Sequence, residues 1–300
     1  MGEQTYRLDR SHGIGYAVRG FSRNCLIRLI DYPELPLRMS TRQTVKAGRS
    51  ALLVQADLPV GNRMLPVAYK RIRRIGWLKK LMGLVRRNRT LRSWRLGLEF
   101  LNRGIATARP LAVIVPRPGT TARDSFLVTE WIDGGLNLTD FCRRIEELPP
   151  LQQARLLQAA AFRLGNLLGQ MHAAGITHRD LKPGNLMLVP RGGDVTAYVI
   201  DLDGANIRRR IPYQLRLRNL SRLALGLEPF RAVGSTVRLR FLVAYLTAVG
   251  ERSREWKSLW RDLDKLTTLR RHQKQRTAAR RNRRATLPFS LPFSLPLSDR

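Results

Sequence analysis

The chain has 300 residues, and its 43% hydrophobic content is enough for a packed core, which excludes a disordered chain. The formal net charge of +33 predicts an attraction to polyanions such as nucleic acid, anionic lipid headgroups or phosphorylated glycolipid. Cys25 and Cys142 form no CxxC pair, which argues against a disulfide framework or a zinc site and suits a reducing cytoplasm.

The basic residues are concentrated in two stretches. Residues 70–95 contain eleven Lys and Arg and no acidic residue, and residues 252–284 contain thirteen basic and three acidic residues. Both stretches could also be ordinary solvated faces, so charge alone does not identify the partner. The polar N-terminus predicts no signal peptide, and no apolar run approaches the ~18–20 residues of a membrane span.

The first part of the chain predicts short strands and two helices. The apolar run 25–30 is compatible with a strand, and residues 59–62 suggest a hairpin turn between two strands. A basic segment follows in which Trp77, Leu78, Leu81, Met82 and Val85 share one helical face. A second helix is expected from about Thr90 to Asn102, ending at Gly104. The strands expected here are 51–55, 66–70, 111–115 and 126–130.

The second part of the chain is mostly helical. Apolar residues between Leu157 and Met171 keep a period of 3.6, which predicts a buried helix. A polar loop comes next, then two short strands at 186–189 and 195–200, and later helices at 215–227 and 236–249. The last ~30 residues are a basic run and then a repeat with proline at every fourth position. Proline at this spacing forbids a regular helix, so we expect a flexible tail.

The polar loop and the strand end that follows it carry the residue types that phosphoryl transfer needs. Asp180 is placed to orient an acceptor hydroxyl, and Lys182 can reach a transferring phosphate. Asn185 and Asp201 offer oxygen ligands to Mg²⁺, a cation that prefers oxygen. Asp203 is a second carboxylate nearby, either a further metal ligand or a turn residue.

The octapeptide HRDLKPGN at 178–185 resembles the catalytic loop of the protein-kinase superfamily, H-R-D-L-K-P-x-N. The resemblance implies an α+β, bilobal protein-kinase-like fold with a small β-rich N-lobe and a larger helical C-lobe. It also implies that Asp180 is the catalytic base, that Asn185 and Asp201 bind the metal, and that His178 is a structural residue of the loop. ATP and Mg²⁺ are the implied cofactors.

Further residues match the nucleotide site of that superfamily. Lys70 ends the strand PVAYK, which is similar to the V-A-I-K motif, and is expected to bind phosphates. Glu130 and Ile132 match the hinge whose backbone holds adenine. Gly48 and Arg49 lie where a glycine-rich loop is expected, and they could still meet the phosphates.

Three departures from the protein-kinase pattern stand out. The loop around Gly48 has only one glycine. The glutamate expected to pair with Lys70 is missing, because its slot falls near Ser93 or Trp94 and the only carboxylate on that helix is Glu99. Finally, DLDG replaces DFG and no APE follows, so the platform for a peptide substrate is absent.

These departures make the chain similar to the bacterial lipopolysaccharide kinases, the Kdo and heptose kinases. The resemblance covers about residues 40–250. It rests on the basic run ahead of Trp94 and Arg95 and on the segments 102–112, 200–203 and 240–246. It implies an acceptor hydroxyl on an inner-core sugar of a membrane glycolipid, modified at the cytoplasmic face. The expected partners are ATP, an anionic glycolipid or sugar acceptor, and an anionic membrane, with a peripheral location on the inner face of the inner membrane.

Two other functions stay open at this point. A Ser/Thr protein kinase is favoured by the complete HRDLKPGN and disfavoured by the missing APE and helix glutamate. A nucleotide-binding or polyanion-binding protein without activity is the second alternative, although nucleic acid is less favoured because few aromatic residues accompany the basic ones. The expected units are an N-terminal extension 1–40 on or near the N-lobe, the N-lobe 41–130, the C-lobe 131–265 and a flexible basic tail 266–300.

Overall fold

The computed structural model describes residues 4–38, 44–47, 51–73, 89–117 and 124–285. The basic helical segment expected around Trp77 to Arg87 and the Pro-rich repeat at the C-terminus lie outside these residues. Within the described part, no helix combines the length and the apolar character needed to cross a bilayer.

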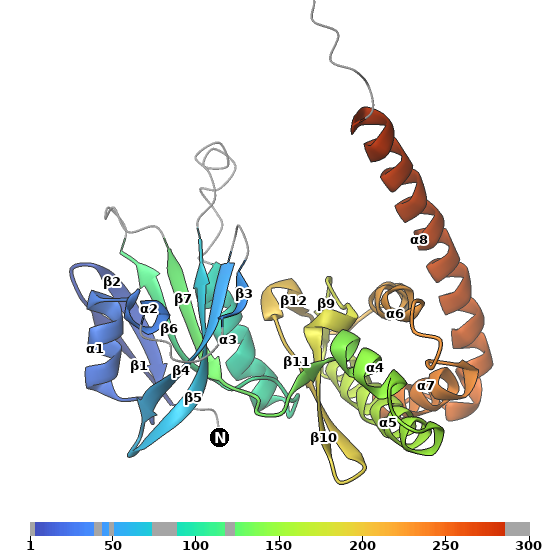
Figure 1. Cartoon of the computed structure of the whole chain (residues 1–300), viewed down its shortest axis with the longest axis horizontal. Helices are drawn as coiled ribbons and strands as arrows, with labels where there is room; N and C mark the ends of the chain where they lie inside the picture. The colour runs from blue at the N-terminus through green and yellow to red at the C-terminus, as the bar shows by residue number, and fades with distance from the viewer. Residues whose placement is uncertain (1–3, 39–43, 48–50, 74–88, 118–123, 286–300) are drawn as a thin grey trace, which may run out of the picture.

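The first half of the chain builds one antiparallel sheet of seven strands in the order β1-β2-β6-β7-β5-β4-β3 (Figure 1). The strand β5 occupies an inner position between β4 and β7, where Lys70 pairs with Leu53 on one side and Leu127 on the other. The strands are β1 (Thr5–Asp9), β2 (Gly13–Val18), β3 (Thr44–Ala47), β4 (Ala51–Val60), β5 (Arg63–Ile72), β6 (Pro110–Pro116) and β7 (Ser125–Glu130).

Helices cover both faces of this sheet. Successive side chains of a strand point to opposite faces, and on β6 Ala112 and Ile114 pack in the cluster that contains α1, while Val113 and Val115 pack against Trp94 of α3. Strand β6 is therefore buried on both of its faces. The helices are α1 (Arg23–Asp31), the short α2 (Leu35–Arg38) and α3 (Arg89–Asn102).

The strand expected at 25–30 is wrong, because these residues form α1. Ser22 caps this helix, its hydroxyl accepting a hydrogen bond from the Cys25 backbone N–H at 3.3 Å. The buried residues Cys25, Leu26, Leu29 and Ile30 then fall on one helical face. The expected helix from Thr90 to Asn102 is confirmed as α3, and Gly104 follows it with a positive φ of 70°.

The second half of the chain surrounds a separate apolar core. Helix α5 runs through it, and α7 packs so closely on α5 that a Cβ added at Gly165 would lie 2.5 Å from the Phe241 carbonyl oxygen. A three-stranded sheet (β11-β10-β8) and a two-stranded one (β12-β9) border this core. These elements are β8 (Leu136–Asn137), α4 (Leu138–Glu146), α5 (Pro150–Ala173), β9 (Ile176–His178), β10 (Leu186–Arg191), β11 (Asp194–Val199), β12 (Ala205–Ile207), α6 (Tyr213–Leu227), α7 (Ser235–Val249) and α8 (Trp256–Ala285).

The expected flexible tail from residue 266 is wrong up to residue 285, because α8 continues to Ala285. The segment 256–285 contains no proline or glycine and is rich in Arg, Lys, Gln, Leu and Ala, which are good helix formers. The first half of α8 contributes the buried Leu259 to the core. Figure 1 shows the rest of the helix projecting away from the body.

Candidate active site

The loop that carries HRDLKPGN is held by backbone pairing on both sides. Strand β9, which ends at His178, pairs with β12 so that His178 lies opposite Ala205. The Arg179 N–H donates to the Gly204 carbonyl at 2.9 Å, and the Ile200 N–H donates to the Asn185 carbonyl at 2.9 Å. These bonds fasten the loop to the 200–205 segment and bring the two stretches that the sequence predicted for catalysis together.

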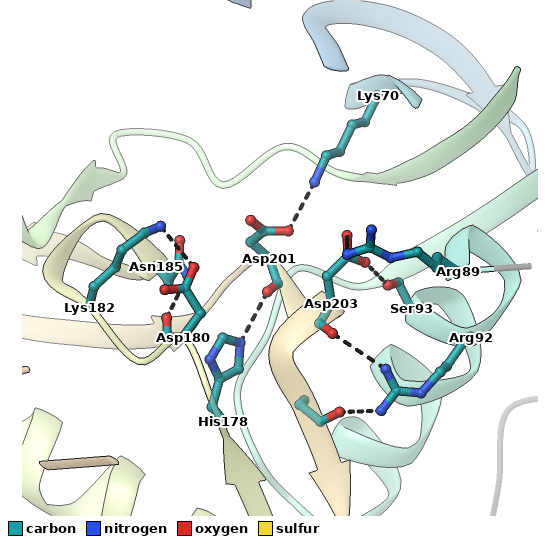
Figure 2. Close-up of polar contacts among 11 residues, drawn as sticks. Lys70, Arg89, Arg92, Ser93, His178, Asp180, Lys182, Asn185, Asp201 and Asp203 are labelled. Carbon is teal, nitrogen blue, oxygen red and sulfur yellow. Dashed lines mark hydrogen bonds and ion pairs between the residues drawn. The ribbon is translucent and has the colours of Figure 1, made fainter. Parts of the chain in front are cut away.

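Within the loop, Asp180, Lys182 and Asn185 form one polar group (Figure 2). The Lys182 Nζ donates to Asp180 Oδ2 at 2.8 Å. The Asn185 Nδ2 donates to the Asp180 carbonyl at 2.8 Å and lies 3.3 Å from Asp180 Oδ2. Because its amide nitrogen is committed to Asp180, the side-chain oxygen of Asn185 is the atom left for another ligand. The Asp180 side chain is 53% exposed and open to an incoming molecule.

Asp201 follows β11 with a left-handed backbone, at φ 57° and ψ 64°. Its carbonyl oxygen is 3.0 Å from His178 Nε2, and its Oδ1 accepts a hydrogen bond from Lys70 Nζ at 3.0 Å. Burial by itself would raise the pKa of the Asp201 carboxyl, but the Lys70 ammonium and the nearby His178 hold this pKa below its usual range. Asp201 is therefore an anion in contact with a cation from the opposite half of the molecule.

The contact between Lys70 and Asp201 joins the two halves across the site (Figure 2). Lys70 comes from β5 in the seven-stranded sheet, and Asp201 comes from the segment that follows β11. Glu99, the carboxylate of α3, does not replace the missing glutamate, because it accepts a hydrogen bond from Arg103 Nε at 2.6 Å, just beyond the end of α3. Within the described residues, no carboxylate of α3 pairs with Lys70.

Asp203 faces α3 and not Asp180. Its Oδ1 accepts a hydrogen bond from the Ser93 hydroxyl, and its Oδ2 is 3.9 Å from an Arg89 nitrogen. Arg92 donates to the carbonyls of Asp203 and Ala205, at 3.3 and 2.5 Å. Of the two roles considered for Asp203, these contacts match the turn residue better than the metal ligand. In the sequence, Ser93 lies near the position where a glutamate partner of Lys70 was expected. No sequence pattern indicated that Ser93 and Arg92 contact Asp203 and Ala205.

The expected hinge lies at the end of β7. The Trp131 N–H donates to the Pro66 carbonyl at 3.0 Å, and Glu130 Oε1 lies 3.4 Å from Arg109 Nη1. The Ile132 N–H, in contrast, donates no backbone hydrogen bond within the described residues. Gly48 and Arg49, the other residues expected at the nucleotide, lie outside those residues.

Asn219 of α6 supports the loop from beneath, a role that sequence patterns did not indicate. Its Oδ1 accepts from the His178 backbone N–H at 2.9 Å and is 3.2 Å from His172 Nε2. The His172 Nδ1 is 2.8 Å from the Tyr245 hydroxyl. Asn219 is fully buried, and burial lowers the pKa of His172 to about 4, so this histidine is neutral at physiological pH. Helices α5, α6 and α7 thus meet directly under the catalytic loop.

Comparison with known proteins places this arrangement in a family. The family model of the lipopolysaccharide kinase (Kdo/WaaP) family matches residues 68–245. The chain is 29% identical over 163 residues to the lipopolysaccharide core heptose(I) kinase WaaP of Escherichia coli, covering 52% of this chain and 60% of that protein. It is 30% identical over 146 residues to the 3-deoxy-D-manno-octulosonic acid kinase of Xylella fastidiosa (strain M12), covering 48% of this chain and 52% of that protein.

These matches span about half of the length of the curated relatives. A solved structure of WaaP in complex with acyl carrier protein superimposes with a TM-score of 0.52 at 22% identity, covering 79% of this chain and 91% of that one. This likeness confirms the expected kinase-like fold. Because the family model matches more than half of the chain and includes Lys70, Asp180, Asn185 and Asp201, the chain belongs to the lipopolysaccharide kinase (Kdo/WaaP) family.

Proposed function

We propose that this protein transfers the γ-phosphate of ATP to a hydroxyl of a lipopolysaccharide core sugar or a similar membrane glycolipid. The observation that carries the proposal is the convergence of Lys70, Asp180, Lys182, Asn185 and Asp201 on one site between the two halves of the molecule. Asp180, Asn185 and Asp201 were predicted from their residue types and from the resemblance to the kinase catalytic loop. Lys182 was predicted from its position two residues after Asp180, and Lys70 from its VAIK-like strand.

In this proposal, Asp180 orients the acceptor. One of its oxygens, Oδ2, is held by Lys182 and Asn185. Oδ1 has no hydrogen-bond donor among the described residues and can accept the hydrogen bond of the sugar hydroxyl, and then its proton. Lys182, 2.8 Å from Asp180, supplies positive charge to the phosphoryl group as it passes to the acceptor.

Asp201 and Asn185 are the proposed metal ligands. The described residues contain no cluster of three or more His, Cys, Asp or Glu side chains suited to a metal. One carboxylate and one amide oxygen nevertheless fit Mg²⁺, which is commonly bound by one or two protein oxygens together with substrate phosphates. When bound, Mg²⁺ would neutralise the negative charge of the phosphates. Lys70 supplies a second cation to the same phosphates, and the Ile132 N–H is available to adenine.

The family resemblance and the local structure favour a sugar acceptor over a protein. Residues 205–212 lead from the catalytic segment through β12 straight into α6. This short connection leaves little backbone to support an extended peptide. We further propose that the enzyme works in the cytoplasm, in peripheral contact with the inner face of the inner membrane.

The test is phosphotransfer from labelled ATP to deep-core lipopolysaccharide, with a generic basic protein as the competing acceptor. Label on the glycolipid alone supports the proposal, and label on the protein alone overturns it in favour of a protein kinase. Asp180→Asn is expected to lower the rate by about 10²–10⁴-fold, because it removes the proton acceptor. Asp201→Asn is expected to abolish transfer, because it removes the charged metal ligand.

A matched control is Glu147→Gln, which also changes a carboxylate to an amide but lies at the exposed end of α4. Circular dichroism and thermal unfolding should show that all three variants remain folded. Full activity of Asp201→Asn would remove the metal assignment, and label on neither acceptor with the native protein would favour the alternative without enzymatic activity.

A further inference from the structure

The two ends of α8 differ sharply in charge. Residues 256–265 carry both signs, with Lys257, Arg261 and Lys265 beside Asp262 and Asp264. From residue 266 to residue 285 there are eight Lys and Arg and no acidic residue. The charge of the distal half is therefore not compensated along the helix itself.

The packing of α8 against the rest of the protein also differs between its first and second halves. Two contacts tie the helix to α6 and its C-cap. The Tyr213 hydroxyl donates to Asp262 at 2.8 Å, and Arg271 Nε donates to Glu228, the C-cap of α6, at 3.1 Å. Beyond Arg271, all side chains from 272 to 279 are exposed. Figure 1 shows this part of the helix leaving the body. We call residues 272–285 the basic arm.

Three arginines lie close to the start of the basic arm: Arg218 and Arg222 of α6 and Arg270 of α8. Arg222 Nη1 donates to the Arg218 carbonyl at 3.2 Å, which places these two residues one turn apart on α6. Arg270 of α8 faces them, and its Nε is buried without a hydrogen-bond partner. Burial, followed by the charges of Arg222 and Arg218, lowers the pKa of Arg270. Among the described residues, none of the three has a carboxylate partner.

Anions from outside the chain would stabilise this group of positive charges. Like charges one turn apart on a helix are destabilising, and screening by phosphate groups would remove this cost. The basic arm has no Phe, Tyr or Trp and only alanine as an apolar residue. It can therefore neither stack on nucleic-acid bases nor insert into hydrocarbon, but it can lie on a plane of negative charge.

We propose that the basic arm, together with Arg218, Arg222 and Arg270, docks on the phosphate-bearing surface of an anionic lipid bilayer. The choice of a bilayer over a nucleic acid rests on the proposed function, in which the acceptor is anchored in a membrane. The partner is a two-dimensional array of phosphodiester headgroups, and the contact is electrostatic without insertion of side chains.

The experiment is flotation of the full chain with vesicles of phosphatidylcholine alone or mixed with phosphatidylglycerol, at low and high salt. Neither vesicle contains glycolipid, so the acceptor plays no part in the result. The native protein is expected to bind the mixed vesicles at low salt and to lose binding at high salt. The double variant Lys274→Gln/Arg276→Gln should bind on the order of 10- to 30-fold more weakly, which corresponds to two headgroup contacts.

The matched control is Arg144→Gln/Arg191→Gln, which removes the same charge from exposed positions on α4 and β10. It should retain most of the vesicle binding. Equal losses in the two double variants would overturn the proposal, because net charge alone would then explain the binding. A loss of affinity for single-stranded RNA without any loss for vesicles would also overturn it.

Docking and catalysis are separable in this design. With an acceptor sugar that lacks its lipid, Lys274→Gln/Arg276→Gln should phosphorylate as fast as the native protein. Failure of phosphotransfer in the native protein would remove the proposed function, while a vesicle defect confined to the arm variant would still support the docking surface.

Discussion

Ser93 and Arg92 connect α3 to Asp203 and Ala205, in the segment that follows Asp201. The sequence indicated a missing glutamate in this helix, and the structure has the Ser93 hydroxyl on Asp203 and the Arg92 guanidinium on two backbone carbonyls. Lys70 pairs with Asp201 in place of a helix carboxylate. Helix α3 therefore contacts the site through Asp203, whereas Lys70 pairs with Asp201 and with no carboxylate of α3 among the described residues.

This coupling predicts the effect of Ser93→Ala. The variant removes a hydrogen bond to a charged group, and such bonds contribute about 1.5–3 kcal/mol. If this loss falls on the positioning of Asp201 and Asp203, kcat should fall by about 10-fold or more, since about 1.4 kcal/mol corresponds to a factor of ten. KM for ATP should change little. Steady-state kinetics against the proposed acceptor would measure both parameters.

Two further variants complete this test. Ser93→Thr keeps the hydroxyl and should restore most of kcat, while Ser258→Ala changes an exposed serine of α8 and should have no effect. A kcat for Ser93→Ala equal to that of the native enzyme would show that Ser93 does not position the catalytic segment.

At the scale of elements, patterns with a strong local signal were predicted correctly. The period of apolar residues in α5 and the Gly104 stop after α3 are local, and both matched the structure. The helix α1 was missed because the short, mostly apolar stretch 25–30 fits a strand as well as a helix, and Ser22 was not considered as a cap. The helix α8 was not predicted at all, and its basic second half was interpreted as a flexible tail.

The candidate site shows the same difference between residues with a local sequence signal and residues without one. Asp180, Lys182, Asn185 and Asp201 lie in two short stretches with recognisable spacing, and the structure brings these stretches together. Asn219 and Ser93 reach the site from α6 and α3, and their roles depend on how helices distant in the sequence pack. No local pattern contains that information.

The close packing of α5 on α7 leads to a prediction at this scale. A Cβ at Gly165 would lie 2.5 Å from the Phe241 carbonyl oxygen and 2.8 Å from the Ala244 Cβ, so the helices must move apart. Overpacking of this kind usually costs about 1–3 kcal/mol. Gly165→Ala should lower the free energy of unfolding by that amount in urea titrations, despite the better helix propensity of alanine.

Gly234→Ala is the corresponding control. Gly234 precedes α7 at φ −73°, and nothing lies within 4 Å of an added Cβ. Its replacement should leave the free energy of unfolding nearly unchanged. If Gly165→Ala were as stable as Gly234→Ala, α5 and α7 would have to lie further apart in the protein than in this structure.

At the scale of the whole molecule, stability should depend on pH through His172, which joins α5, α6 and α7. Its pKa is about 4 in the folded chain, below the usual 6.5. The unfolded chain therefore takes up a proton first as the pH falls, which favours unfolding. The stability from the neutral histidine is complete above pH 6.5 and declines between pH 6.5 and about 4. From pH 7 to pH 5 the loss should be about 2 kcal/mol.

Urea unfolding at pH 7.5, 6 and 5 would measure this decline. His172→Gln retains hydrogen-bonding groups for Tyr245 and Asn219 but cannot titrate, so its stability should vary less with pH over the same interval. An identical pH dependence in the two proteins would exclude His172 as the source. Both proteins share the large positive charge, so self-repulsion affects them equally.

The left-handed backbone of Asp201 also restricts which residues can replace it. Within the described residues, Asp201 is the only non-glycine residue with a positive φ. Residues with a Cβ are strained in this conformation, with Asp and Asn the best tolerated. A related sequence that has lost this carboxylate and still folds should therefore carry Asn or Gly at this position. Asn or Gly at this position in genome data would thus mark relatives that lack the carboxylate proposed here as a metal ligand.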